Sequence, residues 1–231
     1  MVKKQKTCKD SGRRSERGSA LWMVLTGITL LAALNFAVTQ MTRSGGSERI
    51  LSEDRAKLYA HEIVGYAGQI AKRFEEARSW NTTPDNLDFM VPSDPDFDTT
   101  PVIYKVYHPQ GLDVPYQRQL KERLVDDSVS GPGPGWYFAD NTNIGWSPTV
   151  DSEVVLTAYG IDSLVCEMIN KDLAGTRTIP VLQNGKTLDA VFVTGGTALL
   201  AGDCPACENY YKYCVQGTDG VYGYYHVMMD R

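Results

Sequence analysis

Four cysteines stand in the last third of the chain, and two of them form the motif Asp203-Cys204-Pro205-Ala206-Cys207. A Cys-Pro-x-Cys sequence is typical of thiol oxidoreductases, in which a lowered thiol pKa makes one sulfur nucleophilic. That chemistry needs a strand before the motif and a helix after it, because the amino end of the helix stabilises the thiolate. Only six residues separate Cys207 from Cys214, and the βαβ order is missing. Redox catalysis by this CPAC motif is therefore a disfavoured alternative.

The same cysteines could instead bind zinc or form disulfides. By ligand type, Cys204, Cys207 and Cys214 could hold zinc together with Cys166 or His226. An even set of cysteines in a part expected outside the cytoplasm favours two disulfides. Four cysteines allow three pairings, and the sequence does not choose among them. We favour Cys166 with Cys214 and Cys204 with Cys207, and we expect no metal or other cofactor.

A run of acidic residues could bind calcium. Asp94, Asp96 and Asp98 stand at alternate positions in the Pro-rich loop 81–100, a spacing that can present carboxylates to one ion. No Gly follows at the place used in EF-hands, and no Glu closes the loop. We therefore expect a solvated acidic loop and keep these three residues as calcium candidates.

The remaining residues do not predict an enzyme. His61, His108 and His226 lie outside any Gly-x-Ser-x-Gly or His-Glu-x-x-His pattern, and no Gly-rich phosphate loop follows a strand. Residues 1–18 carry seven Lys or Arg and two acidic residues, which leaves 16 basic and 26 acidic residues in the remainder. Such an acidic chain repels phosphates, so we expect no nucleic acid partner.

The elements that would position these residues are of mixed type. Segments rich in β-branched and aromatic residues predict strands at 102–108, 153–159, 189–193 and 221–228. Residues 131–135, Gly-Pro-Gly-Pro-Gly, separate a polar helix at 117–125 from Trp136, and a second short helix fits 161–173. Turns and short helices separate the strands, so an α+β head with an antiparallel sheet is expected over residues 81–231.

A long helix is expected before this head, because residues 47–78 contain no Pro and carry one apolar stripe. The members of the stripe are Leu51, Leu58, Tyr59, Ile63, Tyr66, Ala67, Ile70, Phe74 and Ala77. Adjacent glycines weaken a helix by about 1 kcal/mol each. We therefore expect a bend at Ser44-Gly45-Gly46-Ser47, at the start of an amphipathic segment spanning residues 44–80.

The N-terminal segment is basic and then apolar. From Ser19 to Met41 there are 23 consecutive uncharged residues, which as a helix would cover about 35 Å. That length suffices for a hydrocarbon core of about 30 Å, so residues 19–43 predict a transmembrane helix. The basic residues 1–18 suit a segment retained on the cytoplasmic side. The apolar run is longer than the ~7–15 residues of a secretory signal peptide, and no Ala-x-Ala site closes it.

Residues Glu16-Arg17-Gly18-Ser19-Ala20-Leu21, followed by Met41-Thr42-Arg43 and Glu48-Arg49-Ile50, resemble the start of PilX-type minor pilins. The similarity covers roughly residues 15–75. It implies cleavage of the leader between Gly18 and Ser19, which would also remove Cys8. The apolar segment would then assemble beside those of other subunits through Leu21, Met23, Leu25, Leu30, Leu31, Leu34 and Phe36.

One residue departs from the pattern of major pilins. Those proteins carry a Glu at the fifth position after the cleavage site, where this chain has Met23. In the family that carboxylate is thought to pair with the free amine of a neighbouring subunit, because a buried charge is costly without a partner. The resemblance therefore implies a minor subunit at the tip or in priming.

The resemblance implies a structural subunit of a type IV pilus or a type II secretion filament. Its partners would be other pilin or pseudopilin subunits, prepilin peptidase, an inner-membrane assembly platform and, before assembly, membrane lipid. The expected location is the bacterial inner membrane, as a single span with a periplasmic head, and then the pilus or pseudopilus. The alternatives are an unprocessed single-pass envelope protein with a periplasmic binding head and, less favoured, an envelope thiol oxidoreductase.

Overall fold

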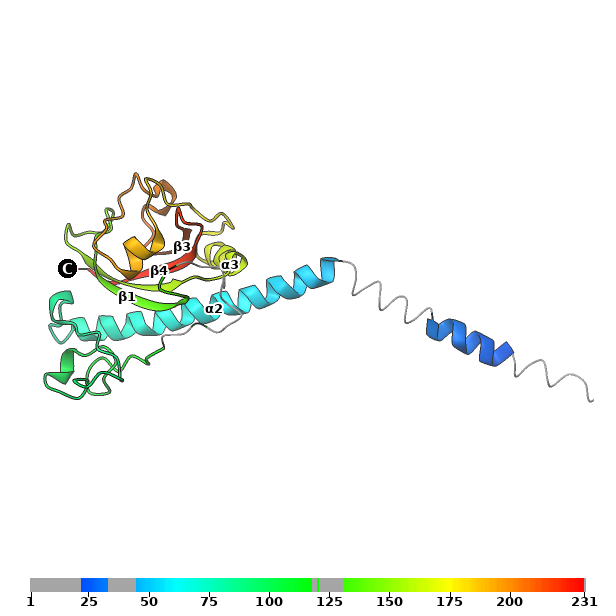
Figure 1. The fold of residues 1–231 in the computed structure, drawn as a ribbon, viewed down its shortest axis with the longest axis horizontal. Helices are drawn as coiled ribbons and strands as arrows, with labels where there is room; N and C mark the ends of the chain where they lie inside the picture. Colours follow the sequence, from blue (N-terminus) through cyan, green and yellow to red (C-terminus); the bar gives the residue numbers. More distant parts are fainter. Residues whose placement is uncertain (1–21, 33–44, 118–119, 121–130, 231) are drawn as a thin grey trace, which may run out of the picture. The chain divides into compact units, whose positions relative to one another are not determined.

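Helices precede and flank a single four-stranded sheet in the part of the chain that the structure describes (Figure 1). A computed structural model describes residues 22–32, 45–117, 120 and 131–230, and for residues 45–52 it describes the backbone alone. The chain divides into two compact units, Met1–Ser52 and Glu53–Arg231. The first unit contains a helix over residues 22–32, and the second contains the sheet and its core.

Within the described residues, no helix combines the length and apolar character that crossing a membrane requires. This finding contradicts the predicted transmembrane helix over residues 19–43 and the fold class built on one long, partly transmembrane N-terminal helix. It likewise contradicts the predicted location as a single-pass protein of the inner membrane with a periplasmic head. The α+β class and the antiparallel sheet are observed, whereas the residues that the structure describes contain no long apolar helix.

The first long helix, α2, spans Gly45–Arg78. Gly45, Gly46 and Ser47 belong to its first turn. Ser44 and the residues before it lie outside the described part of the chain, so the bend expected at Ser44-Gly45-Gly46-Ser47 stays a prediction. From Glu53 onward, one stripe of α2 is buried at steps of three and four residues. Its members are Ala56, Ala60, Ile63, Ala67, Ile70, Phe74 and Ala77. Leu58, which was expected in this stripe, is 65 % exposed because it lies on the opposite side of the helix.

The sheet has the strand order β1-β2-β4-β3, and every neighbouring pair is antiparallel. The strands are β1 (Gly135–Thr142), β2 (Glu153–Tyr159), β3 (Lys212–Gln216) and β4 (Tyr222–Met229). Of the predicted strands, 153–159 and 221–228 are confirmed as β2 and β4. The strands predicted at 102–108 and 189–193 are wrong, because Val102–Tyr104 is a 3-10 helix and Asp189–Val193 is a π-helix.

Helix α3 (Ser163–Ala174) corresponds to the short helix expected at 161–173. Its amino end is capped by Asp162, whose carboxylate accepts a hydrogen bond from the Leu164 backbone N–H at 2.8 Å. Gly175 ends the helix in the left-handed conformation that glycine adopts without steric cost. The polar helix expected at 117–125 falls largely outside the described residues.

Both faces of the sheet are covered, and β2 shows how. All seven of its residues are buried, and successive side chains enter opposite cores because a strand alternates its faces. Val154 and Leu156 join α2 and α3 in one core, while Val155 and Tyr159 join the π-helix in the other. Figure 1 shows α2 along one side of the sheet and the segment between α3 and β3 on the other side.

The two outer strands also have backbone partners from connecting segments. Beside β3, Gln216 donates to the Pro180 carbonyl and accepts from the Leu182 N–H, both at 2.8 Å. Beside β1, the Asn141 carbonyl accepts from the Gly196 N–H at 3.0 Å. Each edge of the sheet is thus partly occupied by the chain itself.

Candidate functional site

The predicted assembly residues that the structure describes are exposed. In the helix over residues 22–32, the exposed fractions of Met23, Leu25, Leu30 and Leu31 range from 57 to 74 %. Trp22, Val24 and Ile28 are exposed as well, so apolar side chains cover every side of this helix. Gly18, Ser19, Leu21, Leu34 and Phe36, together with the predicted leader 1–18, lie outside the described residues.

The disulfide between Cys166 and Cys214 joins α3 to β3, with 5.4 Å between the two Cα atoms. Both residues are fully buried in the core between the helices and the sheet. This is the pairing favoured from the sequence.

The second disulfide, Cys204–Cys207, closes a short 3-10 turn over Pro205–Cys207. The side chains lie in the opposite core and are at most 1 % exposed, so the sulfurs do not face solvent as a redox centre would require. The segment leads into strand β3 rather than into a helix that could stabilise a thiolate. Nothing in this geometry favours the oxidoreductase alternative.

The metal candidates are arranged differently from a metal site. With Cys166, Cys204, Cys207 and Cys214 in disulfides, no thiolate among them is left for zinc. Across the described part of the chain, no cluster of three or more His, Cys, Asp or Glu side chains could hold a metal ion.

The calcium candidates Asp94, Asp96 and Asp98 each make a different contact. Asp94 accepts a hydrogen bond from the Val91 N–H at 2.8 Å, while Asp98 lies 3.3 Å from Nε2 of His108. The ammonium group of Lys105, a residue only 2 % exposed, donates to the backbone carbonyls of Asp96 and, at 2.9 Å, of Phe97. A lysine side chain therefore supplies the positive charge within this loop.

The histidines occupy three unrelated places. His61 lies on α2 with Nδ1 3.7 Å from a carboxylate oxygen of Asp172 on α3. His226 lies on β4, opposite Lys212, and the Tyr224 hydroxyl is 3.4 Å from its Nδ1. Burial, helped by the nearby Lys212 charge, lowers the pKa of His226 to about 4, so the ring is neutral at pH 7.

Glu153 is a fully buried carboxylate at the start of β2. It accepts a hydrogen bond from the Ile144 N–H at 2.8 Å and another from the Ser147 hydroxyl. Burial raises the pKa of Glu153 against the lowering effect of these two donors. Because its oxygens bind the loop after β1, Glu153 serves to hold that loop.

A cavity that the sequence did not indicate lies between α2 and β1. Its volume is about 350 Å³, at the lower end of the range for small-molecule sites. The lining side chains come from α2, from β1 and from the segment that follows Pro115. They are His61, Glu62, Ile63, Gly65, Tyr66, Gln69, Gln117, Leu120 and Trp136. These residues are far apart in sequence, and no motif connects them.

Tyr66 and Trp136 form the aromatic part of this cavity. Their ring centroids are 4.7 Å apart with the planes tilted by 51°, so the rings contact one another. The Tyr66 hydroxyl donates to the Pro115 carbonyl at 2.8 Å, which fixes the ring against the segment carrying Gln117. Burial raises the pKa of Tyr66 to about 12, so it stays a neutral phenol at pH 7.

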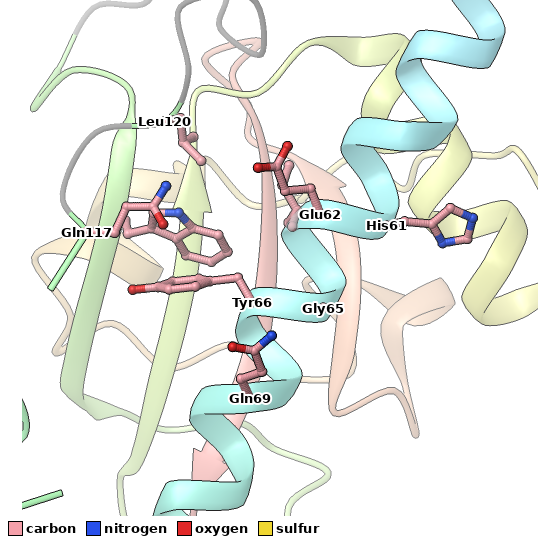
Figure 2. Close-up of a pocket in the computed structure, with 9 residues that line it drawn as sticks. His61, Glu62, Gly65, Tyr66, Gln69, Gln117 and Leu120 are labelled. Carbon is pink, nitrogen blue, oxygen red and sulfur yellow. The ribbon is translucent and has the colours of Figure 1, made fainter. Parts of the chain in front are cut away.

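Figure 2 shows the arrangement of the labelled side chains. Glu62, Tyr66 and Gln117 gather on one side of α2, and Gln69 follows Tyr66 by about one helical turn. His61 points away from them, in keeping with its contact to Asp172. The group around the cavity therefore presents aromatic surface, two amides and one carboxylate.

Comparison with models of known protein families, with curated protein sequences and with solved structures finds no match to this chain.

Proposed function

We propose that the chain is a minor pilin-like structural subunit of a filament of the type IV pilus or type II secretion class. The observation that carries this proposal is the exposed apolar surface of residues 22–32. Trp22, Met23 and Leu30 are each more than two-thirds exposed. Contiguous apolar surface of this kind marks a contact surface, because leaving it in water is unfavourable.

The sequence context says what would cover this surface. The residues from Glu16 to Leu21 resemble a prepilin leader and its cleavage site. In such proteins the apolar segment packs beside the same segment of other subunits, so further copies of pilin-like chains are the proposed partners. Prepilin peptidase would cut between Gly18 and Ser19.

The head supports the same proposal. The amphipathic part of α2 packs its buried stripe on an antiparallel sheet, and a disulfide holds the C-terminal part of that sheet to α3. A subunit of this type has a structural role and no reaction to catalyse. Met23 is uncharged and needs no amine from a neighbouring subunit, which favours a position at the tip or in priming.

The deciding experiment is mass spectrometry of the amino terminus of the protein isolated from its own cells. We expect a chain that begins at Ser19. A chain that retains the lysine-rich residues before Gly18, or that begins after Met41, would contradict the proposal.

A matched pair of substitutions tests the contact surface itself. Val24→Arg places a charge on the apolar helix, whereas Val150→Arg makes the same change at a residue of the head that is 90 % exposed. We expect Val24→Arg to abolish recovery of the chain in sheared filaments and Val150→Arg to leave it unchanged. Equal recovery of both variants would rule out assembly through residues 22–32.

A further inference from the structure

Glu153 and Ser147 belong to a set of hydrogen bonds that needs one proton more than an ionised carboxylate leaves it. The Ser147 hydroxyl lies within hydrogen-bonding distance of two oxygens, Oε1 of Glu153 and, at 2.9 Å, the Thr149 carbonyl. A serine hydroxyl has one proton to donate and lone pairs that accept. Ser147 can therefore donate to only one of these oxygens, and the proton for the other contact must come from its partner.

A protonated Glu153 supplies this proton. Its acid O–H donates to Oγ of Ser147, and Ser147 then donates to the Thr149 carbonyl. Oε2 of Glu153 remains an acceptor for the Ile144 N–H at 2.8 Å. Each of the three contacts then joins one donor to one acceptor. With an ionised carboxylate, one of the two contacts of Ser147 would instead bring two acceptor oxygens together.

Burial favours the protonated form of Glu153. The residue is fully buried, where a charge is costly. Burial raises the pKa of Glu153 more than hydrogen bonds from Ser147 and from the backbone N–H groups of Ile144 and Glu153 lower it. The nearby negative charge of Asp151 raises the pKa further. Burial and the count of protons thus favour the same neutral acid.

The groups on the neighbouring elements fit this assignment. On β1, Thr142 lies opposite Glu153 and donates its own hydroxyl proton to the Val191 carbonyl at 2.6 Å. Asp151, which precedes β2, lines a cavity of about 510 Å³ together with Arg78, Asp85 and Asp230. In that cavity the guanidinium group of Arg78 is paired with the carboxylate of Asp230.

We propose that Glu153 is held as a neutral carboxylic acid that donates to Ser147 in the folded head at neutral pH. Loss of this proton in alkaline solution leaves Ser147 unable to bond both Glu153 and Thr149, and so frees the Thr149 end of loop 143–151. This pH-sensitive contact belongs to the head and does not depend on how the chain assembles. Either proposal can therefore fail without the other.

The first test is infrared spectroscopy of the full-length chain at pH 7 in a polyoxyethylene detergent, which contains no carboxyl group. Solvent-exposed carboxyl groups are ionised at this pH. We expect a C=O band of a protonated carboxylic acid that shifts in D₂O and is lost in Glu153→Gln. Absence of the band from the unsubstituted chain, or an undiminished band in Glu153→Gln, would overturn the proposal.

Asp162→Asn is the matched control for this spectrum. The Asp162 carboxylate also accepts a backbone N–H, but the residue is exposed at the start of α3. Asparagine caps a helix as well as aspartate does, so the fold should be retained. We expect the acid band to be unchanged in this variant. Loss of the band in Asp162→Asn would assign the proton to the wrong carboxyl group and refute the proposal.

The second test compares the unsubstituted chain with Glu153→Gln by urea denaturation at pH 5, 7 and 9. The Gln side chain reproduces the neutral acid, because its NH₂ group can donate to Ser147 and its carbonyl can accept from Ile144. The folded chain keeps the Glu153 proton at a pH where the unfolded chain has released it. The unsubstituted chain should therefore lose stability relative to Glu153→Gln as the pH rises.

Within the pH range in which only the folded chain holds this proton, the unfolding equilibrium constant should rise about tenfold per pH unit relative to Glu153→Gln. His226 is present in both chains, so its titration cancels in the comparison. A difference that stays constant over the three pH values would contradict the proposal. Failure of Glu153→Gln to fold would contradict it as well, because the amide replaces each hydrogen bond of the acid.

Discussion

Asn170 on α3 and Cys214 on β3 are joined by two reciprocal hydrogen bonds. The Asn170 side-chain amide donates to the Cys214 carbonyl at 2.8 Å, and the Cys214 N–H donates to Oδ1 of Asn170 at 2.9 Å. A buried side chain thus pairs with the strand as another strand would, beside the disulfide that Cys214 makes with Cys166. Helix and sheet are connected at this point by both polar and covalent bonds.

Replacing this asparagine should destabilise the head. Asn170→Ala removes the partners of two buried backbone groups of Cys214 and of the Thr178 carbonyl, which Nδ2 also reaches at 3.0 Å. We expect a loss of about 2–4 kcal/mol in the free energy of unfolding, measured by chemical denaturation. Lys171→Ala, at the exposed neighbouring position, is the control and should change stability by less than about 0.5 kcal/mol. Similar losses in both variants would contradict the role given to Asn170.

The two disulfides should contribute unequally to the stability of the head. Cys166–Cys214 closes a loop with a sequence separation of 48, and Cys204–Cys207 one of 3. On the chain-entropy estimate the long loop contributes about 4 kcal/mol and the short one about 1.6 kcal/mol. Paired Cys→Ala variants of each disulfide, compared by thermal denaturation without reductant, should show the larger loss for Cys166 and Cys214. The reverse order would contradict this ranking.

Lys105 should stabilise the acidic loop in place of a metal. Lys105→Met leaves the Asp96 and Phe97 carbonyls without their ammonium donor, and we expect a loss of about 2 kcal/mol. The exposed Lys72→Met is the control. Calcium added to the unsubstituted chain should leave its melting temperature unchanged, because Lys105 already supplies the positive charge of the loop. A calcium-dependent rise abolished by Asp96→Asn would instead indicate a calcium site.

His226 should make the head sensitive to acid. Its pKa is lowered to about 4 by burial and by Lys212, against 6.5 for the free side chain. Between pH 4 and 6.5 the unfolded chain therefore binds more protons at this residue than the folded chain does. The contribution of His226 to the free energy of unfolding is fully present above pH 6.5 and is lost as the pH drops from 6.5 towards 4. Within this range the free energy of unfolding should change by roughly 1.4 kcal/mol per pH unit.

The test of this acid sensitivity is a difference measurement. His226→Gln removes the titrating ring while retaining a polar side chain, so the stability difference between the two chains should change only in that pH window. Urea denaturation at pH 7.5, 6, 5 and 4.5 measures it. His61→Gln, at an exposed position on α2, serves as the control. Parallel stability curves for the unsubstituted chain and His226→Gln would contradict the assignment.

The sequence pattern alone predicted those elements whose local preference agrees with their surroundings in the fold. After Glu153, strand β2 consists of β-branched and apolar residues, and the sheet buries both of its faces. Helix α3 is preceded by Asp162 and followed by Gly175, two residue types that favour helix ends. In both cases the segment's own preference and its surroundings favour the same structure.

Tertiary contacts explain why two of the predicted strands are wrong. Residues 102–108 are rich in β-branched and aromatic residues, yet the Lys105 side chain turns inward to the carbonyls of Asp96 and Phe97, and the chain turns there. Residues 189–193 bury the consecutive side chains of Val191 and Phe192, which a short apolar helix does as well as a strand. Strands β1 and β3 were not predicted, because polar residues end β1 and flank the apolar centre of β3.

The cavity could not have been predicted, because its residues come from positions 61–69, 117, 120 and 136. Tyr66 was counted among the apolar residues of the stripe, although its hydroxyl reaches Pro115 and its ring contacts Trp136. Only the packing of α2 against β1 brings these side chains together.

The partners that flank the outer strands limit how copies of this chain can join. Residues 180–182 bond to Gln216 on β3, and Gly196 bonds to Asn141 on β1. A second molecule adding a strand at either side would first have to displace these segments. In a polymer of this protein we therefore expect side-chain contacts to join the subunits. The β-sheet of one subunit would not continue into the next.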